Sequence, residues 1–180
     1  MSYKNYLLLL ASVLASCVHS ADTHDQPLSS FEDSSLCQKT EVALVSCQMD
    51  EPQQRMLAIC HANDLPEIHY RLGTHDKVDA GVTFTAQNPL LRWIDSSAYT
   101  TYFVFKDSDQ YYSIGVPQET HGAKVFMDIF DQQGQEVANL SCINNSFADK
   151  TLASPAIIDL DDKEIYKHGV NFPYDYYTNE

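Results

Sequence analysis

The residues best able to do chemistry in this 180-residue chain are its five cysteines. Cys37, Cys47, Cys60 and Cys142 form an even set, and thiols of an exported chain tend to pair as disulfides. Cys17 is left over and follows an N-terminal apolar segment. No Cys-x-x-Cys spacing occurs, so neither a redox motif nor a zinc ribbon is indicated. The sequence therefore predicts four disulfide-bonded cysteines and one with a separate role.

Four cysteines allow three pairings, and the spacing restricts one of them. A turn at residues 50–53 would place Cys47 opposite Met56 in a hairpin, with Cys60 four residues further along the same face. At ~3.3 Å per residue this separation is about 13 Å, beyond the ~7 Å between Cα atoms that a disulfide can bridge. A Cys47–Cys60 pair would need a shifted register. Cys142 is then expected to reach back to the N-terminal region, closing a loop of roughly 80–100 residues.

Imidazole and carboxylate groups, which can bind zinc, crowd into one segment: His61, Asp64, His69, His75, Asp76 and Asp79. No two of these histidines have the i,i+4 spacing of a helical site, so we interpret them as scattered surface side chains. The chain also lacks a Gly-x-Ser-x-Gly nucleophile motif and a phosphate-binding glycine loop. The sequence predicts a protein that is not an enzyme and needs no metal or cofactor.

The first residues have the pattern of a secretory signal: Lys4 near the start, then an apolar run over 6–15 that is too short to span a bilayer. Cleavage before Ala21 fits an ordinary signal peptidase and would give a soluble periplasmic or secreted protein. Residues 14–17, Leu-Ala-Ser-Cys, instead fit a bacterial lipobox. The odd cysteine favours the second reading, with a signal peptide over 1–16, lipidation of Cys17 and a flexible tether over 17–36. Because Val18 and not an aspartate follows Cys17, we expect an outer-membrane lipoprotein facing the periplasm.

The elements that must position these residues are short and β-rich. Val, Ile, Thr, Tyr and Phe are concentrated in eight runs separated by turn clusters, which predicts an all-β fold, an antiparallel sandwich or barrel of about seven or eight strands. The runs are 41–48, 54–60, 67–72, 81–86, 101–106, 111–116, 124–130 and 135–142. Four-residue loops at 107–110 and 131–134 predict two hairpins.

The domain is expected to span 37–143, with a C-terminal extension over 144–180. Acidic residues begin and basic residues end the segment at about 159–168, and a glycine follows, which predicts one short helix. The aromatic and acidic end of the chain is interpreted first as a tail packed on the sheet and, alternatively, as a partner-binding segment.

Three motifs resemble a family of small exported bacterial β-rich proteins: the spacing of the first three paired cysteines, the run Ile68-His69-Tyr70-Arg71-Leu72-Gly73, and a last strand ending at Cys142. The resemblance covers roughly residues 37–142. It implies a β fold and export, and no catalytic residues, because the family has no established activity. The chain departs from the family at 95–99, where a glycine-rich stretch is expected, and in its long acidic C-terminal extension.

The chain carries 25 acidic and 11 basic side chains, a formal net charge of −14. Such a surface repels nucleic acids and attracts basic proteins at long range. We therefore predict a protein-binding module, an inhibitor or immunity protein against a toxin or envelope hydrolase, that touches the membrane only through its lipid. The alternative is a structural envelope lipoprotein in outer-membrane assembly or adhesion. The expected contacts are acidic loop residues and tail tyrosines: Asp107, Asp109, Asp131, Tyr174, Tyr176 and Tyr177.

Overall fold

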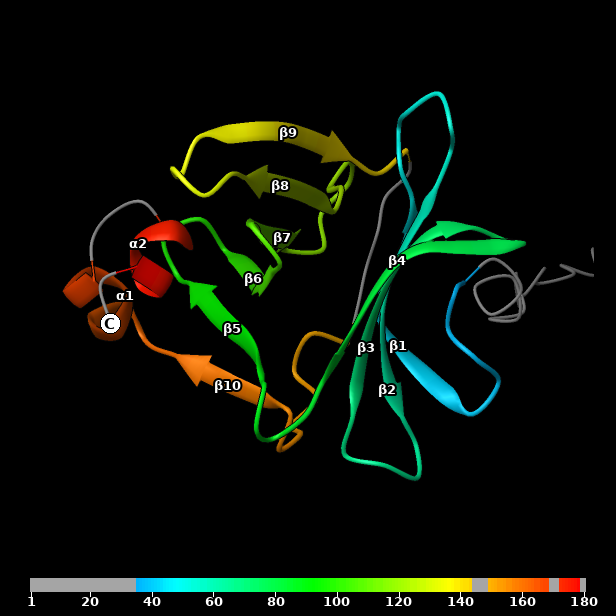
Figure 1. The fold of residues 1–180 in the computed structure, drawn as a ribbon, viewed down its shortest axis with the longest axis horizontal. Coiled ribbons are helices and arrows are strands. Elements are labelled where there is room, and N and C mark those ends of the chain that lie inside the picture. The colour runs from blue at the N-terminus through cyan, green and yellow to red at the C-terminus, as the bar shows by residue number, and fades with distance from the viewer. Residues whose placement is uncertain (1–34, 144–148, 169–171, 179–180) are drawn as a thin grey trace, which may run out of the picture.

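The computed structural model describes residues 35–143, 149–168 and 172–178. The expected signal peptide, Cys17 and nearly all of the tether lie outside these residues. The fold is mostly β, with ten strands in two sheets and two short helices within the described residues (Figure 1). The predicted all-β class is confirmed. Neither helix in the described part of the chain is long and apolar enough to cross a membrane.

The first sheet is an antiparallel meander of four strands in sequence order. It contains β1 (Glu41–Gln48), β2 (Met56–Ala62), β3 (Ile68–Thr74) and β4 (Lys77–Phe84). Leu57, Ile59 and Tyr70 on one face belong to the main core, whereas Ala58 and Cys60 on the opposite face are buried outside it. This alternation is the period-2 pattern of a sheet with one face on a core.

The second sheet has six strands in the order β10-β5-β6-β7-β8-β9. All neighbours are antiparallel except β10 and β5, which are parallel. The strands are β5 (Leu90–Asp95), β6 (Thr100–Asp107), β7 (Gln110–Pro117), β8 (Phe126–Phe130), β9 (Glu136–Ser141) and β10 (Ile157–Leu160). Strands β5 and β10 are additional to the eight runs expected from the sequence.

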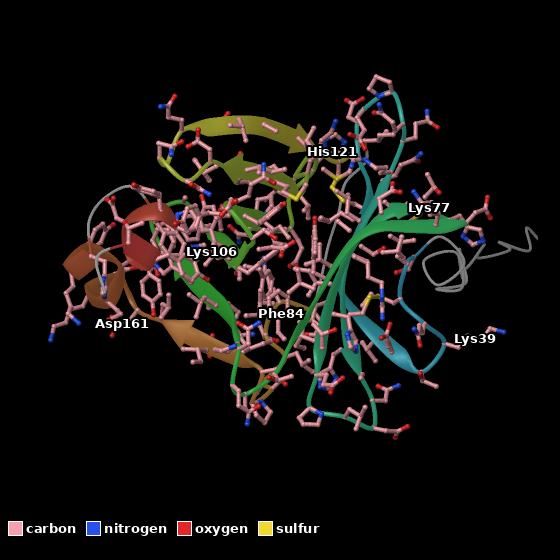
Figure 2. All side chains as sticks on the ribbon, in the orientation of Figure 1. Lys39, Lys77, Phe84, Lys106, His121 and Asp161 are labelled. Atoms are coloured by element: carbon pink, nitrogen blue, oxygen red, sulfur yellow. A yellow bond between two sulfur atoms is a disulfide. The ribbon has the colours of Figure 1, made fainter. Side chains whose placement is uncertain are left out.

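The main core lies between the two sheets. The ring of Phe105 from β6 packs 4.8 Å from Tyr70 and 5.2 Å from Phe84, centroid to centroid. Figure 2 shows Phe84 between the sheets, and it is almost fully buried. The three rings therefore join β3, β4 and β6 across the sandwich.

The C-terminal extension covers the outer face of the second sheet. It contains α1 (Asp162–His168) and α2 (Tyr174–Thr178), and α1 contacts β5. Leu91 and Val104 point to this outer face and are buried, as is Ile165 of α1, although none of them belongs to the main core. The helix expected at about 159–168 begins at Asp162, because the residues just before it form β10.

Two disulfides staple the fold. Cys37–Cys60 ties the segment before β1 to β2, and Cys47–Cys142 ties β1 to the end of β9. The Cys47–Cys60 pair disfavoured by spacing is not formed, and Cys142 does reach back to the N-terminal region. The register is one residue from the expected one: Cys47 pairs with Leu57, because the turn takes one more residue, Gln54, at φ 50°.

Candidate functional site

The expected contact residues come together at one end of the second sheet. Tyr111 pairs with Phe130, so the β6–β7 and β8–β9 turns lie next to each other. Asp107 and Asp109 belong to the first turn, and Asp131 begins the second. We call these three carboxylates, with Tyr174 and Tyr177, the acidic tip.

The β6–β7 turn is tighter than the expected four-residue loop. Asp107 pairs with Gln110, which leaves Ser108 and Asp109 as a two-residue connection. Ser108 has φ 53°, the left-handed conformation that two-residue hairpin turns require. This geometry presents Asp109 at the extreme end of the hairpin, where it is exposed.

The β8–β9 loop is organised by its own aspartate. One carboxylate oxygen of Asp131 accepts hydrogen bonds from the backbone N–H groups of Gln133 and Gln135, both at 2.9 Å. Such a side-chain-to-backbone turn fixes the loop without other partners. Within the described residues, none of the three carboxylates of the acidic tip forms an ion pair, so their charge is available to solvent or a partner.

Two of the tail tyrosines pack on Tyr111, the second residue of β7. The ring of Tyr111 lies 5.5 Å from that of Tyr174 and 5.6 Å from that of Tyr177, centroid to centroid. The Lys106 ammonium lies 5.2 Å above the Tyr111 ring, and Figure 2 shows Lys106 near the C-terminal helices. The tail is thus packed on the sheet, as the first interpretation expected, and its tyrosines remain half-buried beside the aspartates.

Tyr176 is part of the same helix but contacts other rings. Its ring lies 4.9 Å from His168 and 6.3 Å from Phe172. The structure therefore brings Tyr174 and Tyr177 to the end of the sheet that holds the two turns, and turns Tyr176 toward α1. Asp107 lies on the inner face of that sheet, near Tyr112.

His69, one histidine of the histidine-rich segment, makes contacts between strands of the first sheet. His69 Nδ1 lies 3.1 Å from Thr83 Oγ1, and its Nε2 lies 3.6 Å from Glu41. Arg71 holds Glu41 by two hydrogen bonds of 2.6 and 2.7 Å. Burial alone would raise the pKa of Glu41, but the hydrogen bonds from Arg71 and from the Gln38 N–H outweigh it and lower this pKa. The pair ties the start of β1 to β3, and Arg71 also donates to the carbonyl oxygen of Leu36 in the segment before β1.

One group of metal-binding atom types comes close together within the described residues, made by Cys37, Glu41 and Cys60. Both cysteines are joined in a disulfide, and the Glu41 carboxylate is held by Arg71. The group is therefore part of the staple that fixes β1 and β2.

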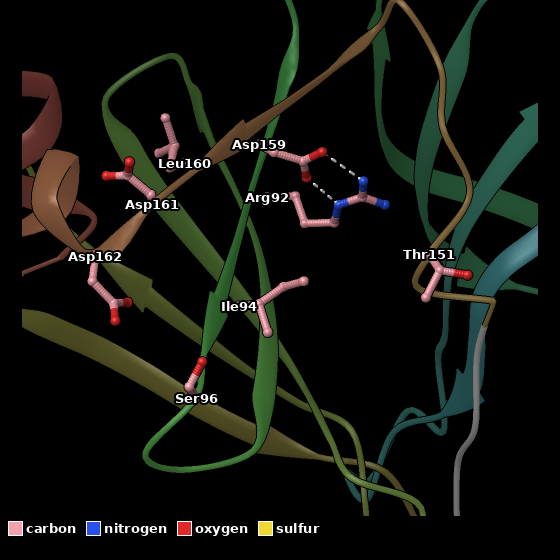
Figure 3. Close-up of a pocket in the computed structure, with 8 residues that line it drawn as sticks. All are labelled: Arg92, Ile94, Ser96, Thr151, Asp159, Leu160, Asp161 and Asp162. Carbon is pink, nitrogen blue, oxygen red and sulfur yellow. Dashed lines mark hydrogen bonds and ion pairs between the residues drawn. The ribbon is translucent and has the colours of Figure 1, made fainter.

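A recess that the sequence did not indicate lies where β5 and β10 end, at the opposite end of β6 from the acidic tip. It measures about 410 Å³, and its lining includes Arg92, Ile94, Asp159 and Asp162 (Figure 3). Arg92 stands in an otherwise apolar run, and a buried arginine of this kind requires a partner. That was the only signal in the sequence, and it does not reveal that the partner is Asp159, which lies far away in the chain.

Comparisons with protein-family models, with curated proteins and with solved structures find no match to this chain. The proposals below are therefore argued from the geometry and charge of the described residues.

Proposed function

We propose that this protein is a protein-binding module of the cell envelope, a lipid-anchored inhibitor or immunity protein that neutralises a basic toxin or envelope hydrolase. The observation that carries the proposal is the acidic tip. Two neighbouring turns carry three carboxylates that form no ion pair within the described residues, and two half-buried tyrosines of α2 pack on Tyr111 at the same end of the sheet. Tyrosine is enriched in protein interfaces, and exposed carboxylates near it can steer a basic partner toward the site.

Electrostatics supports a basic partner. A net charge of −14 on a small domain steers cations toward it and raises association rates, an effect that salt screens. The two disulfides suit a protein that must keep one shape outside the cytoplasm. A stiff scaffold also lowers the entropy cost of binding, because the contact residues are already in place.

The test uses the exported full chain as bait in an envelope extract at physiological salt. The wild-type protein should retain a basic protein that D109N/D131N loses. The matched control is D64N/D76N, which removes the same charge from exposed turns of the first sheet. If nothing is retained, or if both variants weaken retention equally, the acidic tip is not the contact site.

The structural-lipoprotein alternative makes a different prediction for a deletion strain. Loss of a structural component should change outer-membrane permeability, whereas loss of an immunity protein should change only sensitivity to the toxin. Measuring both in the same strain separates the two functions.

A further inference from the structure

The two disulfides interleave along the chain. In sequence order the paired cysteines are Cys37, Cys47, Cys60 and Cys142, and the bonds join the first to the third and the second to the fourth. Each bond therefore encloses one cysteine of the other pair. No native bond joins two cysteines that follow each other in this order, so every bond between neighbouring members of the set is non-native.

Chain entropy favours the non-native bonds at first. In an unfolded chain the probability of closing a loop falls with roughly the three-halves power of the loop length. The bonds Cys37–Cys47 and Cys47–Cys60 close about 10 and about 13 residues, whereas the native Cys37–Cys60 closes 23. Among these three bonds, the native one should form first in about one molecule in seven. Both competing bonds contain Cys47.

The native partner of Cys47 is also the last cysteine to emerge. An exported chain appears from its N-terminus, and at synthesis rates of about 5–20 residues per second Cys142 follows Cys60 by about 4–16 s. A disulfide can form within seconds when the oxidant is strong. During this interval, bonds with Cys37 and Cys60 are the only ones open to Cys47 within the set.

The folded sheet excludes the non-native bonds. Cys47 lies opposite Leu57 and packs against the main core, to which Cys142 belongs. Cys60 is buried on the other face of the same sheet, outside that core, and bonds there to Cys37. The β1–β2 hairpin alone does not enforce this separation, because an isolated two-stranded hairpin is at best marginally stable. Correction of a wrong bond must therefore precede the packing of the first sheet.

We propose that this protein matures through disulfide exchange catalysed by a thiol–disulfide isomerase that acts on the bonds of Cys47. Such a partner recognises an unfolded chain by exposed apolar strands. Leu57 and Ile59, which the native core buries completely, supply that surface while the first sheet is open. The proposal goes beyond the proposed function, from which it takes only export to an oxidising compartment.

The exchange conserves the number of sulfur–sulfur bonds. The isomerase thiolate attacks the Cys37 sulfur of a Cys37–Cys47 bond, which forms a mixed disulfide and releases the Cys47 thiolate. The Cys60 thiolate then attacks the same Cys37 sulfur, which forms Cys37–Cys60 and returns the isomerase thiolate. A Cys47–Cys60 bond is corrected in the same way through the Cys60 sulfur. The released Cys47 thiolate takes a proton from water, and its later bond to Cys142 gives two electrons and two protons to an oxidising protein disulfide.

A refolding experiment follows each cysteine separately. The exported full chain is treated with N-ethylmaleimide to block any free thiol, and is then unfolded and reduced. It is diluted into a glutathione buffer with or without protein disulfide isomerase, and samples are quenched with iodoacetamide. Trypsin separates the four cysteines, because Lys39 and Arg55 divide the first three and Arg71 lies between Cys60 and Cys142. Mass spectrometry of the linked peptides then identifies each bond.

Early samples without the isomerase should contain mainly bonds of Cys47 to Cys37 or Cys60. The native Cys37–Cys60 bond should be present in about one molecule in seven. The isomerase should produce the native pairs at least about tenfold faster, since uncatalysed rearrangement takes minutes to hours. If the native pairs form first, and equally fast without the isomerase, the proposal is overturned.

Two double variants test the same chemistry in cells. C47A/C142A and C37A/C60A each retain one native pair, so neither forms a wrong bond within the set. In cells that lack the isomerase, the yield of exported wild-type protein should fall by up to about sevenfold, whereas each variant should give the same yield in both strains. Equal wild-type yields would overturn the proposal. So would an equal fall in all three proteins, because the isomerase would then act on the unfolded chain and not on its disulfides.

These readouts are independent of the proposed function, since none of them involves a bound toxin or hydrolase. An envelope extract that yields no captured protein would refute the acidic tip as a contact site and leave the maturation route unchanged. Native pairing that needs no isomerase would refute the maturation route alone.

Discussion

The two disulfides differ chiefly in the length of chain that they close, and this difference gives a stability prediction. Cys47–Cys142 closes 95 residues and Cys37–Cys60 closes 23. In the chain-entropy model these closures stabilise the fold by about 4.7 and about 3.4 kcal/mol. C47A/C142A should therefore lose about 1.3 kcal/mol more than C37A/C60A.

The comparison is matched because each pair joins one fully buried cysteine to one half-buried cysteine. Cys60 and Cys142 are both 0% exposed, whereas Cys37 and Cys47 are partly exposed. The packing lost by truncation to alanine is then similar in the two double variants and largely cancels in the difference. What remains is the effect of loop length on the unfolded chain.

The assay is equilibrium unfolding in urea, followed by far-ultraviolet circular dichroism and by fluorescence of the single tryptophan, with midpoints and slopes compared. The expected order of stability is wild type, then C37A/C60A, then C47A/C142A. If C37A/C60A is the less stable variant, loop closure does not dominate and the covalent link between the segment before β1 and β2 matters more than the closure joining β1 to β9.

Three further predictions concern single residues. R92L should lower the free energy of unfolding by about 3 kcal/mol, because it removes the hydrogen bonds that hold the C-terminal extension. Amide hydrogen exchange should then become faster over residues 150–160, and unchanged exchange would contradict this. The pKa of Glu41 is lower in the folded protein than the ordinary value of 4.5, so the ionised carboxylate stabilises the fold. This contribution is complete above about pH 4.5 and is lost as the pH falls through the lower folded pKa. E41Q should therefore be less stable than the wild type at pH 7, and the two unfolding curves should converge in strong acid. G134A should lower the melting temperature by an amount equivalent to about 1–2 kcal/mol, because Gly134 has φ 73° and a Cβ there would lie 2.6 Å from the Tyr174 ring; an unchanged midpoint would mean that the tail does not pack as described.

The strands missed from the sequence show where pattern reading stops. Arg92 and Asp95 place two charges in the six residues of β5, so the segment is not recognised as a strand from its sequence. Its Arg92 is explained only by β10, since Asp159 pairs with it in the parallel register. Short-range patterns detect strands that are regular by themselves, whereas β10 is a four-residue strand defined by its parallel pairing with β5.

The sequence by itself determined the β class, both hairpins, the even set of paired cysteines and the acidity, because alternation, turn residues and charge act over a few positions or over the whole composition. It also limited the disulfides, since a Cys47–Cys60 bond would require a shifted hairpin register. Only the tertiary structure decided that Cys47 bonds to Cys142, that the tail tyrosines pack on Tyr111 beside the β8–β9 loop, and that a recess opens at the far end of β6. These depend on register and on packing between segments far apart in the chain, where a shift of one residue reverses the face that every side chain occupies.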